Sequence, residues 1–214
     1  MKVLAVDAAS GQSSVALIAE ESEFYECARE TRAHADQLLP LVTRVLEAGK
    51  VSLADLDGLA FGRGPGGFTG LRVAAAVVQG LAFGYDKPVA GISTLAALAQ
   101  PWVADHDVLV CTDARKGQVY TGTFTADATG LARVQGVEQV VDPDAVSVTA
   151  VDIIGVGDGF DAYPELRDRV ERYHSSVNSG ALAIARLAAA GWADFMEPFH
   201  ATPVYVRDSV THSK

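Results

Sequence analysis

The sequence predicts an α/β protein, with mixed sheets flanked by helices, built from two consecutive copies of one β-β-β-α-β-α unit. The first observation is an echo: "VLAVDAASGQSSVALI" and "VLVCTDARKGQVYTGTF" both show a strand ending in Asp-Ala, two variable residues, Gly-Gln and a second strand. The second is that the elements after each segment follow the same order. The expected domains are residues 1–100 and 101–214, divided where Pro101 stops a helix.

In the first copy, strands are expected near 2–8, 13–19 and 23–30, then a helix at 33–48. A strand at 57–62, a helix at 69–84 and a strand at 88–92 follow. The alternation in "SSVALI" is typical of a half-buried strand, and "HADQLLPLVTRVLEAG" has a helical apolar stripe closed by Gly49.

The second copy is expected to follow the same order more loosely. Its strands are placed near 107–113, 118–125 and 132–141, before a short helix at 143–146, a strand at 151–156 and helices at 161–170 and 179–191. Gly11 and Gly117 are expected in the tight turns of the two opening hairpins.

Composition excludes several classes of protein. No run of eighteen residues lacks a charged or polar interruption, and the amino terminus reads as a strand, so we expect a cytoplasmic protein with no membrane span. Cys27 and Cys111 are far apart and form no C-x-x-C, so both are expected as buried small hydrophobes. A net charge of −10 argues against direct gripping of nucleic acid.

The stretch "GRGPGGFTG" has the glycine spacing of two phosphate-binding loops and fails the rest of both patterns. Phe68 stands where a P-loop needs lysine, and no acid ends the next strand, "PVAGIST". We therefore expect a structural turn that starts a helix. Its residues are Gly62, Gly64, Pro65, Gly66, Gly67, Phe68, Thr69 and Gly70.

Two units that each open with an Asp-bearing hairpin resemble the actin, hexokinase and Hsp70 type of fold, which consists of duplicated ribonuclease-H-like domains. In that fold the hairpins and a later glycine stretch face a nucleotide in a cleft. The resemblance places Asp7, Asp113, Gly155 and Gly157 at such a cleft. The alternative is that the glycines only make turns and each aspartate accepts N–H groups of its own turn.

The segment "GRGPGGFTGLR" resembles the signature G-R-G-P-G-S-F-T-G-[LIV]-R of the TsaB family, also called YeaZ. The stretches "LAVDAA", "HADQLLPLV", "GISTLAALA", "DARKGQVY" and "TPVYVRD" follow in the family's order. The chain departs from the family at Gly67, where serine is usual, and at Ala8-Ala9, where hydroxyl residues are usual. The departures leave fewer groups to hold a magnesium phosphate.

The resemblance implies an accessory protein without catalytic residues, cofactor or metal. Such a scaffold binds TsaD, a catalytic relative of the same fold, which with the ATPase TsaE places a threonylcarbamoyl group on N6 of adenosine 37 in tRNAs decoding ANN codons. The chain would contact tRNA only through the complex and would pair with itself when TsaD is absent.

Two rival functions stay open, a kinase-like ATP-binding enzyme and a metal-dependent, glycoprotease-like peptidase. Neither is favoured, because the loop lacks its lysine and no two of the five histidines are three, four or five residues apart. There is no G-x-S-x-G. His34 is expected to cap a helix or lie at the surface.

The helix at 69–84 predicts a partner-binding surface. Leu71, Ala74, Val77, Val78 and Leu81 share a face expected to pack on the sheet. The opposite face carries little charge for an exposed helix and suits helix-on-helix binding. The predicted contact residues are Arg72, Ala76, Gln79 and Phe83, with Leu39 and Leu46 from the first helix. The alternative is that loops of the same chain cover this face.

Overall fold

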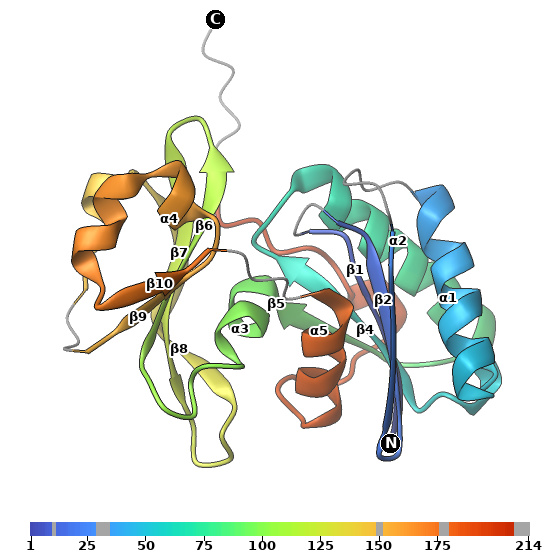
Figure 1. The fold of residues 1–214 in the computed structure, drawn as a ribbon. Helices are drawn as coiled ribbons and strands as arrows, with labels where there is room; N and C mark the ends of the chain where they lie inside the picture. Colours follow the sequence, from blue (N-terminus) through green and yellow to red (C-terminus); the bar gives the residue numbers. More distant parts are fainter. Residues whose placement is uncertain (10–11, 29–34, 149–151, 176–179, 208–214) are drawn as a thin grey trace, which may run out of the picture. The chain divides into compact units, whose positions relative to one another are not determined.

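The computed structural model describes residues 1–9, 12–28, 35–148, 152–175 and 180–207. The chain divides into two compact units (Figure 1). One consists of Met1–Ala97 with Asn178–Pro203, and the other of Leu98–Val177 with Val204–Lys214.

The first unit is built on a five-stranded mixed sheet with the order β3-β2-β1-β4-β5. Strands β1 to β3 are antiparallel, and β4 and β5 run parallel to β1. The strands are β1 (Lys2–Asp7), β2 (Ser14–Ala19), β3 (Ser22–Cys27), β4 (Gly58–Gly64) and β5 (Val89–Ser93).

Helices cover both faces of this sheet. On one side α1 (Ala35–Gly49) packs on β2 and β3, and α2 (Phe68–Tyr85) packs on β1 and β4; α5 (Gly180–Ala189) packs on the other side (Figure 1). Buried side chains from alternate strand positions fill the core beneath α1 and α2, among them Leu4, Val6, Leu17, Leu59 and Phe61. The unit also contains the short helix η1 (Leu53–Asp55) and η4 (Pro198–His200), and α3 (Thr94–Ala99) leads into the second unit.

The second sheet repeats the topology of the first, with the order β10-β9-β6-β7-β8. Strands β6 to β8 are antiparallel, and β9 and β10 are parallel to β6. The strands are β6 (Val108–Arg115), β7 (Gln118–Ala126), β8 (Ala132–Val141), β9 (Ile154–Val156) and β10 (Arg172–His174). Corresponding strands thus occupy corresponding places, as the duplication predicts.

The second half departs from its expected elements in three places. The helix expected at 161–170 is α4 (Gly159–Ala162) followed by η3 (Pro164–Arg169), because Pro164 cannot continue an α-helix. The helix expected at 143–146 is the single turn η2 (Pro143–Ala145), and β10 was not expected.

The expected division into 1–100 and 101–214 needs a correction for α5. This helix packs against β1, β2 and β4, so residues 178–203 belong with the first sheet. Helix α5 follows the last strand of the second sheet in the sequence, so the chain returns to the first unit only after the second sheet is complete.

The end of α1 shows a different role for Gly49 than helix termination. A Cβ on Gly49 would lie 2.5 Å from Leu17 Cδ2, so glycine leaves room for the Leu17 side chain of β2. The left-handed residue is Lys50, with φ of 52°. The N–H groups of Lys50 and Val51 donate to the carbonyls of Glu47 and Leu46, the bonding pattern of a Schellman motif.

Candidate partner-binding site

The glycine-rich loop packs against the first hairpin. The Gly67 N–H donates a hydrogen bond to the Ala9 carbonyl oxygen at 3.1 Å. A Cβ on Gly70 would lie 1.7 Å from the Ala8 carbonyl oxygen, and one on Gly66 would lie 3.0 Å from that of Ala9. Because no side chain fits between backbones this close, only glycine allows α2 to begin here.

The start of the loop is equally tight. A Cβ on Gly62 would lie 2.6 Å from Asp7 Oδ1 and 3.0 Å from Thr94 Cγ2. Gly64 has φ of 108°, a region that favours glycine, and the Thr94 hydroxyl donates to the Pro65 carbonyl. The loop therefore joins β4 to α2 while packed against its own chain.

Phe68 and Arg72 form a pair at the start of α2. The guanidinium carbon of Arg72 lies 3.6 Å from the centroid of the Phe68 ring, and Phe68 is 50% exposed. This is a cation–π contact, so the positive charge of Arg72 is held over an exposed aromatic face. Thr69 beside them is also exposed.

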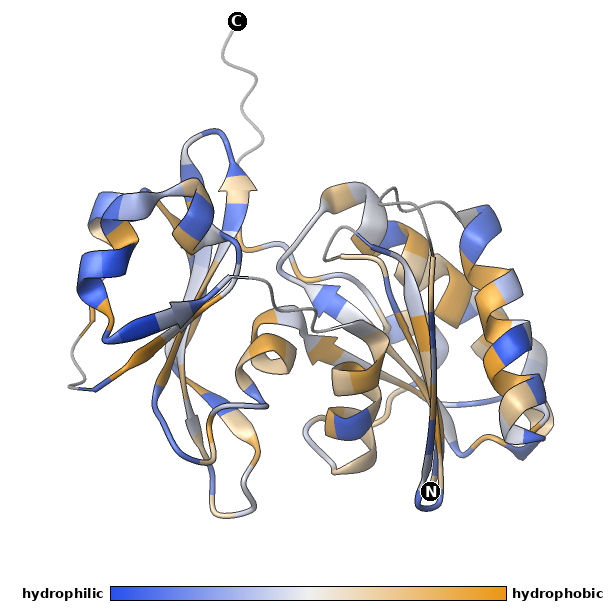
Figure 2. Ribbon diagram, viewed as in Figure 1, coloured by the Kyte–Doolittle hydropathy of each residue, from blue (hydrophilic) through white to orange (hydrophobic). Residues whose placement is uncertain are grey.

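An apolar groove of about 540 Å³, the α1–α2 groove, runs between the two helices. Leu39 of α1 is 51% exposed at its edge. Figure 2 shows α1 alternating between apolar and polar bands, as an amphipathic helix does. The groove is lined by Leu39, Arg72, Val73, Ala76, Val77, Gly80 and Leu81.

The fold itself does not require glycine at Gly80 or Gly84 of α2. A Cβ on Gly80 or Gly84 would meet nothing within 4 Å. Glycine in a helix interior costs about 1 kcal/mol relative to alanine. At Gly80 and Gly84 no side chain projects from the outer surface of α2, which allows another backbone to approach closely.

Two of the predicted contact residues, Gln79 and Leu46, are partly buried. Gln79 is partly buried, and its Nε2 donates to the carbonyl oxygens of Pro198 and Ala201 at 3.1 and 3.0 Å. Its long side chain therefore holds the segment around η4. Leu46 is partly buried and packs on the core, whereas Ala76 and Phe83 are exposed, Phe83 to 62%.

The buried face of α2 is also rotated from the predicted one. Val77 and Leu81 are only partly buried and line the groove, while Ala75 and Ala82 are buried. Leu71, Ala74 and Val78 are buried as predicted.

The two hairpin aspartates bind groups of their own turns. Asp7 is fully buried, and its Oδ1 accepts the Ala9 N–H at 3.1 Å. Asp113 Oδ1 accepts the Arg115 N–H at 2.8 Å and the Tyr163 hydroxyl at 3.1 Å. Burial and that bond to the carboxylate raise the pKa of Tyr163. Turn aspartates adopt this geometry without a ligand, so a nucleotide role for either stays a prediction.

The glycine stretch of the second unit serves close packing. A Cβ on Gly157 would lie 2.3 Å from the Cys111 carbonyl oxygen, and Gly157 has φ of 116°. A Cβ on Gly155 would lie 2.5 Å from the Phe160 ring. Both glycines let α4 pack on β6 and β9, and their place in a nucleotide cleft also stays a prediction.

Nucleophilic and metal chemistry find little support in the described residues. Burial raises the pKa of the Cys111 thiol to about 12, which leaves it unreactive at neutral pH. Within the described ranges, no three His, Cys, Asp or Glu residues are grouped so that they could hold a metal ion. His34 and His212 lie outside those ranges.

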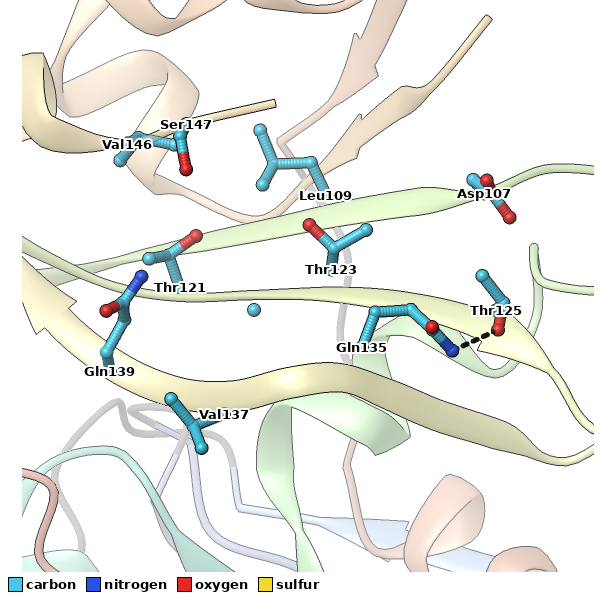
Figure 3. Close-up of a pocket in the computed structure, with 11 residues that line it drawn as sticks. Asp107, Leu109, Thr121, Thr123, Thr125, Gln135, Val137, Gln139, Val146 and Ser147 are labelled. Carbon is cyan, nitrogen blue, oxygen red and sulfur yellow. Dashed lines mark hydrogen bonds between the residues drawn. The ribbon is translucent and has the colours of Figure 1, made fainter. Parts of the chain in front are cut away.

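The second sheet carries a polar hollow of about 370 Å³ over β7 and β8 (Figure 3). Gln135 Nε2 donates to Thr125 Oγ1 at 2.7 Å on its floor. Its lining contains one carboxylate and no cation, so it does not suit a phosphate. The polar lining residues are Asp107, Thr121, Thr123, Thr125, Gln135, Gln139 and Ser147.

By length and composition alone, α2 is apolar enough to cross a membrane, although no such segment was expected. In this fold it packs on β1 and β4, and 33% of the helix is buried. A helix that is both apolar and largely exposed is uncommon on the surface of a globular protein.

Comparisons with known proteins agree with this architecture. Residues 28–208 match the family described as TsaD, tRNA N6-adenosine threonylcarbamoyltransferase. The whole chain is 34% identical to the tRNA threonylcarbamoyladenosine biosynthesis protein TsaB of Escherichia coli (strain K12) and covers 98% of it.

Solved structures extend the likeness to three dimensions. YeaZ from Pseudomonas aeruginosa is 37% identical, with a TM-score of 0.87 over 95% of this chain and 99% of that one. Component A of (R)-2-hydroxyglutaryl-CoA dehydratase from Acidaminococcus fermentans is 12% identical, with a TM-score of 0.51 over 89% and 99%, and shows the fold alone. The chain therefore has the duplicated ribonuclease-H-like fold and belongs to the TsaB (YeaZ) family, whose members are named for the biosynthesis of tRNA threonylcarbamoyladenosine.

Proposed function

We propose that the chain is a non-catalytic scaffold that binds TsaD through the α1–α2 groove. With the ATPase TsaE, the complex would threonylcarbamoylate N6 of adenosine 37 in tRNAs that read ANN codons, in the cytoplasm. The observation that carries the proposal is the groove itself, which is apolar and exposed on a helix that needs no glycine at Gly80 or Gly84 for its own packing.

The chemistry of the groove fits another helix. Leu39, Val77 and Leu81 supply apolar walls, and Gly80 lets a partner backbone come close. Phe83 projects from the same helix as an aromatic anchor, the residue class that contributes most at interfaces.

The proposed partner has the same architecture, because residues 28–208 of this chain match the TsaD family itself. Related molecules can meet through equivalent helices about a near two-fold axis. The same surface would let two copies of this chain pair when TsaD is absent.

The absence of catalysis is part of the proposal. Asp7 and Asp113 are engaged in their own turns. The net charge of −10 favours contact with tRNA only through the complex. Assays of ATP hydrolysis and bound metal on the purified chain separate this function from a kinase-like enzyme and from a peptidase.

The test is the double substitution Ala76→Glu with Phe83→Ala. The introduced glutamate would be solvated in the free chain and buried without a counter-ion in the complex, which costs several kcal/mol. Loss of the Phe83 ring removes roughly 2 kcal/mol more. We expect TsaD affinity to fall by about three decades or more while thermal melting is unchanged.

The matched control is Ala48→Glu, which makes the same change at an exposed position of α1 outside the groove lining. It should bind TsaD as wild type does. Co-elution of the folded double variant with TsaD would place the interface elsewhere, and failure of the variant to fold would make that face part of the core.

A further inference from the structure

We infer that the TsaD-binding surface extends from the α1–α2 groove onto η4, where Phe199 provides a second aromatic contact. The inference rests on the proposed function, because it takes TsaD as the occupant. It concerns a segment far from α2 in sequence that Gln79 fixes beside it.

The backbone of this segment is anchored on both sides of Phe199. Gln79 Nε2 donates to the Pro198 and Ala201 carbonyls, at 3.1 and 3.0 Å. Pro198 is buried and Ala201 is 1% exposed. The turn between these two fixed points presents Phe199 outward, 61% exposed, with its ring centroid 3.7 Å from that of His200.

Phe83 lies one helical turn after Gln79 on the same side of α2, and it is 62% exposed. Phe83 and Phe199, on adjoining elements, are thus exposed to solvent although the fold has a buried core. Single exposed apolar residues are common, but a fixed pair beside an apolar groove is typical of an interaction surface.

By holding the backbone on both sides of Phe199, Gln79 would preorganise η4 for binding. A side chain on a turn already held by two hydrogen bonds and two buried neighbours loses little conformational entropy on binding. Gln79 acts as a positioning residue, since it reaches the partner only through the segment that carries Phe199.

We take TsaD as the occupant because residues 28–208 of this chain match the TsaD family. The residues that line the groove are uncharged except for Arg72, which is held over Phe68. A neutral surface of this kind favours a packed protein helix over a nucleic acid.

The test compares Phe199→Ser with Val137→Ser in equilibrium binding to TsaD. Val137 is the control, a 72% exposed apolar side chain on β8 of the second unit. Phe199→Ser should weaken binding about tenfold or more, as truncation of an interface anchor does, and Val137→Ser should change it less than about twofold. Both should melt as wild type does.

Ala76→Glu with Phe83→Ala is measured in parallel as the reference. If that variant loses binding and Phe199→Ser does not, the η4 inference is wrong and the proposed function stands. If neither variant loses binding, the proposed function fails and the inference with it. Weakened self-association with unchanged TsaD affinity would assign Phe199 to a second copy and also overturn the inference.

A double-mutant cycle tests the positioning role of Gln79. Gln79→Ala should weaken TsaD binding several-fold in the wild-type background and less than about twofold in the Phe199→Ser background. Equal losses in both backgrounds would show that Gln79 supports only the fold.

Discussion

Two glycines of α2, Gly70 and Gly80, have different roles, and the atoms around each position distinguish them. Gly70 has the Ala8 carbonyl oxygen 1.7 Å from where its Cβ would be, while Gly80 has nothing within 4 Å. The two positions lie in one helix and differ only in what surrounds them. Motif spacing identified the first as part of a turn, but spacing could not show that the second faces open space.

Gly70→Ala is predicted to destabilise the first unit by about 3 kcal/mol, because the backbone must shift. Gly80→Ala is predicted to stabilise it by about 1 kcal/mol through helix propensity. Thermal melts of the two variants against wild type measure both effects. Equal destabilisation by the two changes would mean that Gly80 is packed against the rest of the chain.

At the scale of elements, ion pairs tie the edge strand β3 to its helices. Glu23 accepts two hydrogen bonds from Arg186 of α5, Nε to Oε1 at 2.8 Å and Nη2 to Oε2 at 2.6 Å. These bonds hold the pKa of Glu23 below its usual range. Since α5 reaches the first sheet from the far end of the chain, this pair helps to hold the returning segment.

Glu23→Gln is predicted to lower stability at pH 7 by up to about 1 kcal/mol, because both groups are partly exposed. A depressed pKa in the folded state contributes stability above the ordinary glutamate value of about 4.3, and that stability is lost as pH falls through the folded value. Denaturation midpoints measured from pH 7 downward should therefore show a difference between the variant and wild type that is full at pH 7 and shrinks as the pH falls below about 4.3. A difference that persists at low pH would assign the effect to packing.

Most elements could be predicted from periodicity, and the failures have physical causes. Strand β10 has three residues, too few to show alternation, and its place depends on pairing with β9. Helix α5 was located, but its packing on the first sheet depends on tertiary contacts that a local pattern does not contain. Of the predicted contact residues, Leu39, Arg72, Ala76 and Phe83 are exposed. Gln79 and Leu46 are partly buried, which helical phase alone does not reveal, and their contact with a partner stays a prediction.

At the scale of the whole molecule, the charge limits what the chain does alone. With a net charge of −10 it lacks the excess of Lys and Arg that supplies most affinity for phosphates. We predict that the isolated chain binds tRNA only weakly and without specificity at physiological salt. Filter binding with cognate and non-cognate tRNA tests this, and a submicromolar dissociation constant for the chain alone would contradict it.

We propose that this chain activates TsaD without taking part in the chemistry. The most direct measurement is threonylcarbamoylation of tRNA by TsaD and TsaE, supplied with a threonylcarbamoyl donor and ATP, with different forms of the chain. We expect no product without the chain, full product with wild type and with Asp7→Asn or Asp113→Asn, and none with Ala76→Glu combined with Phe83→Ala. Loss of product with a folded Asp7→Asn or Asp113→Asn chain that still binds TsaD would contradict it, since the chain would then contribute a group to the reaction.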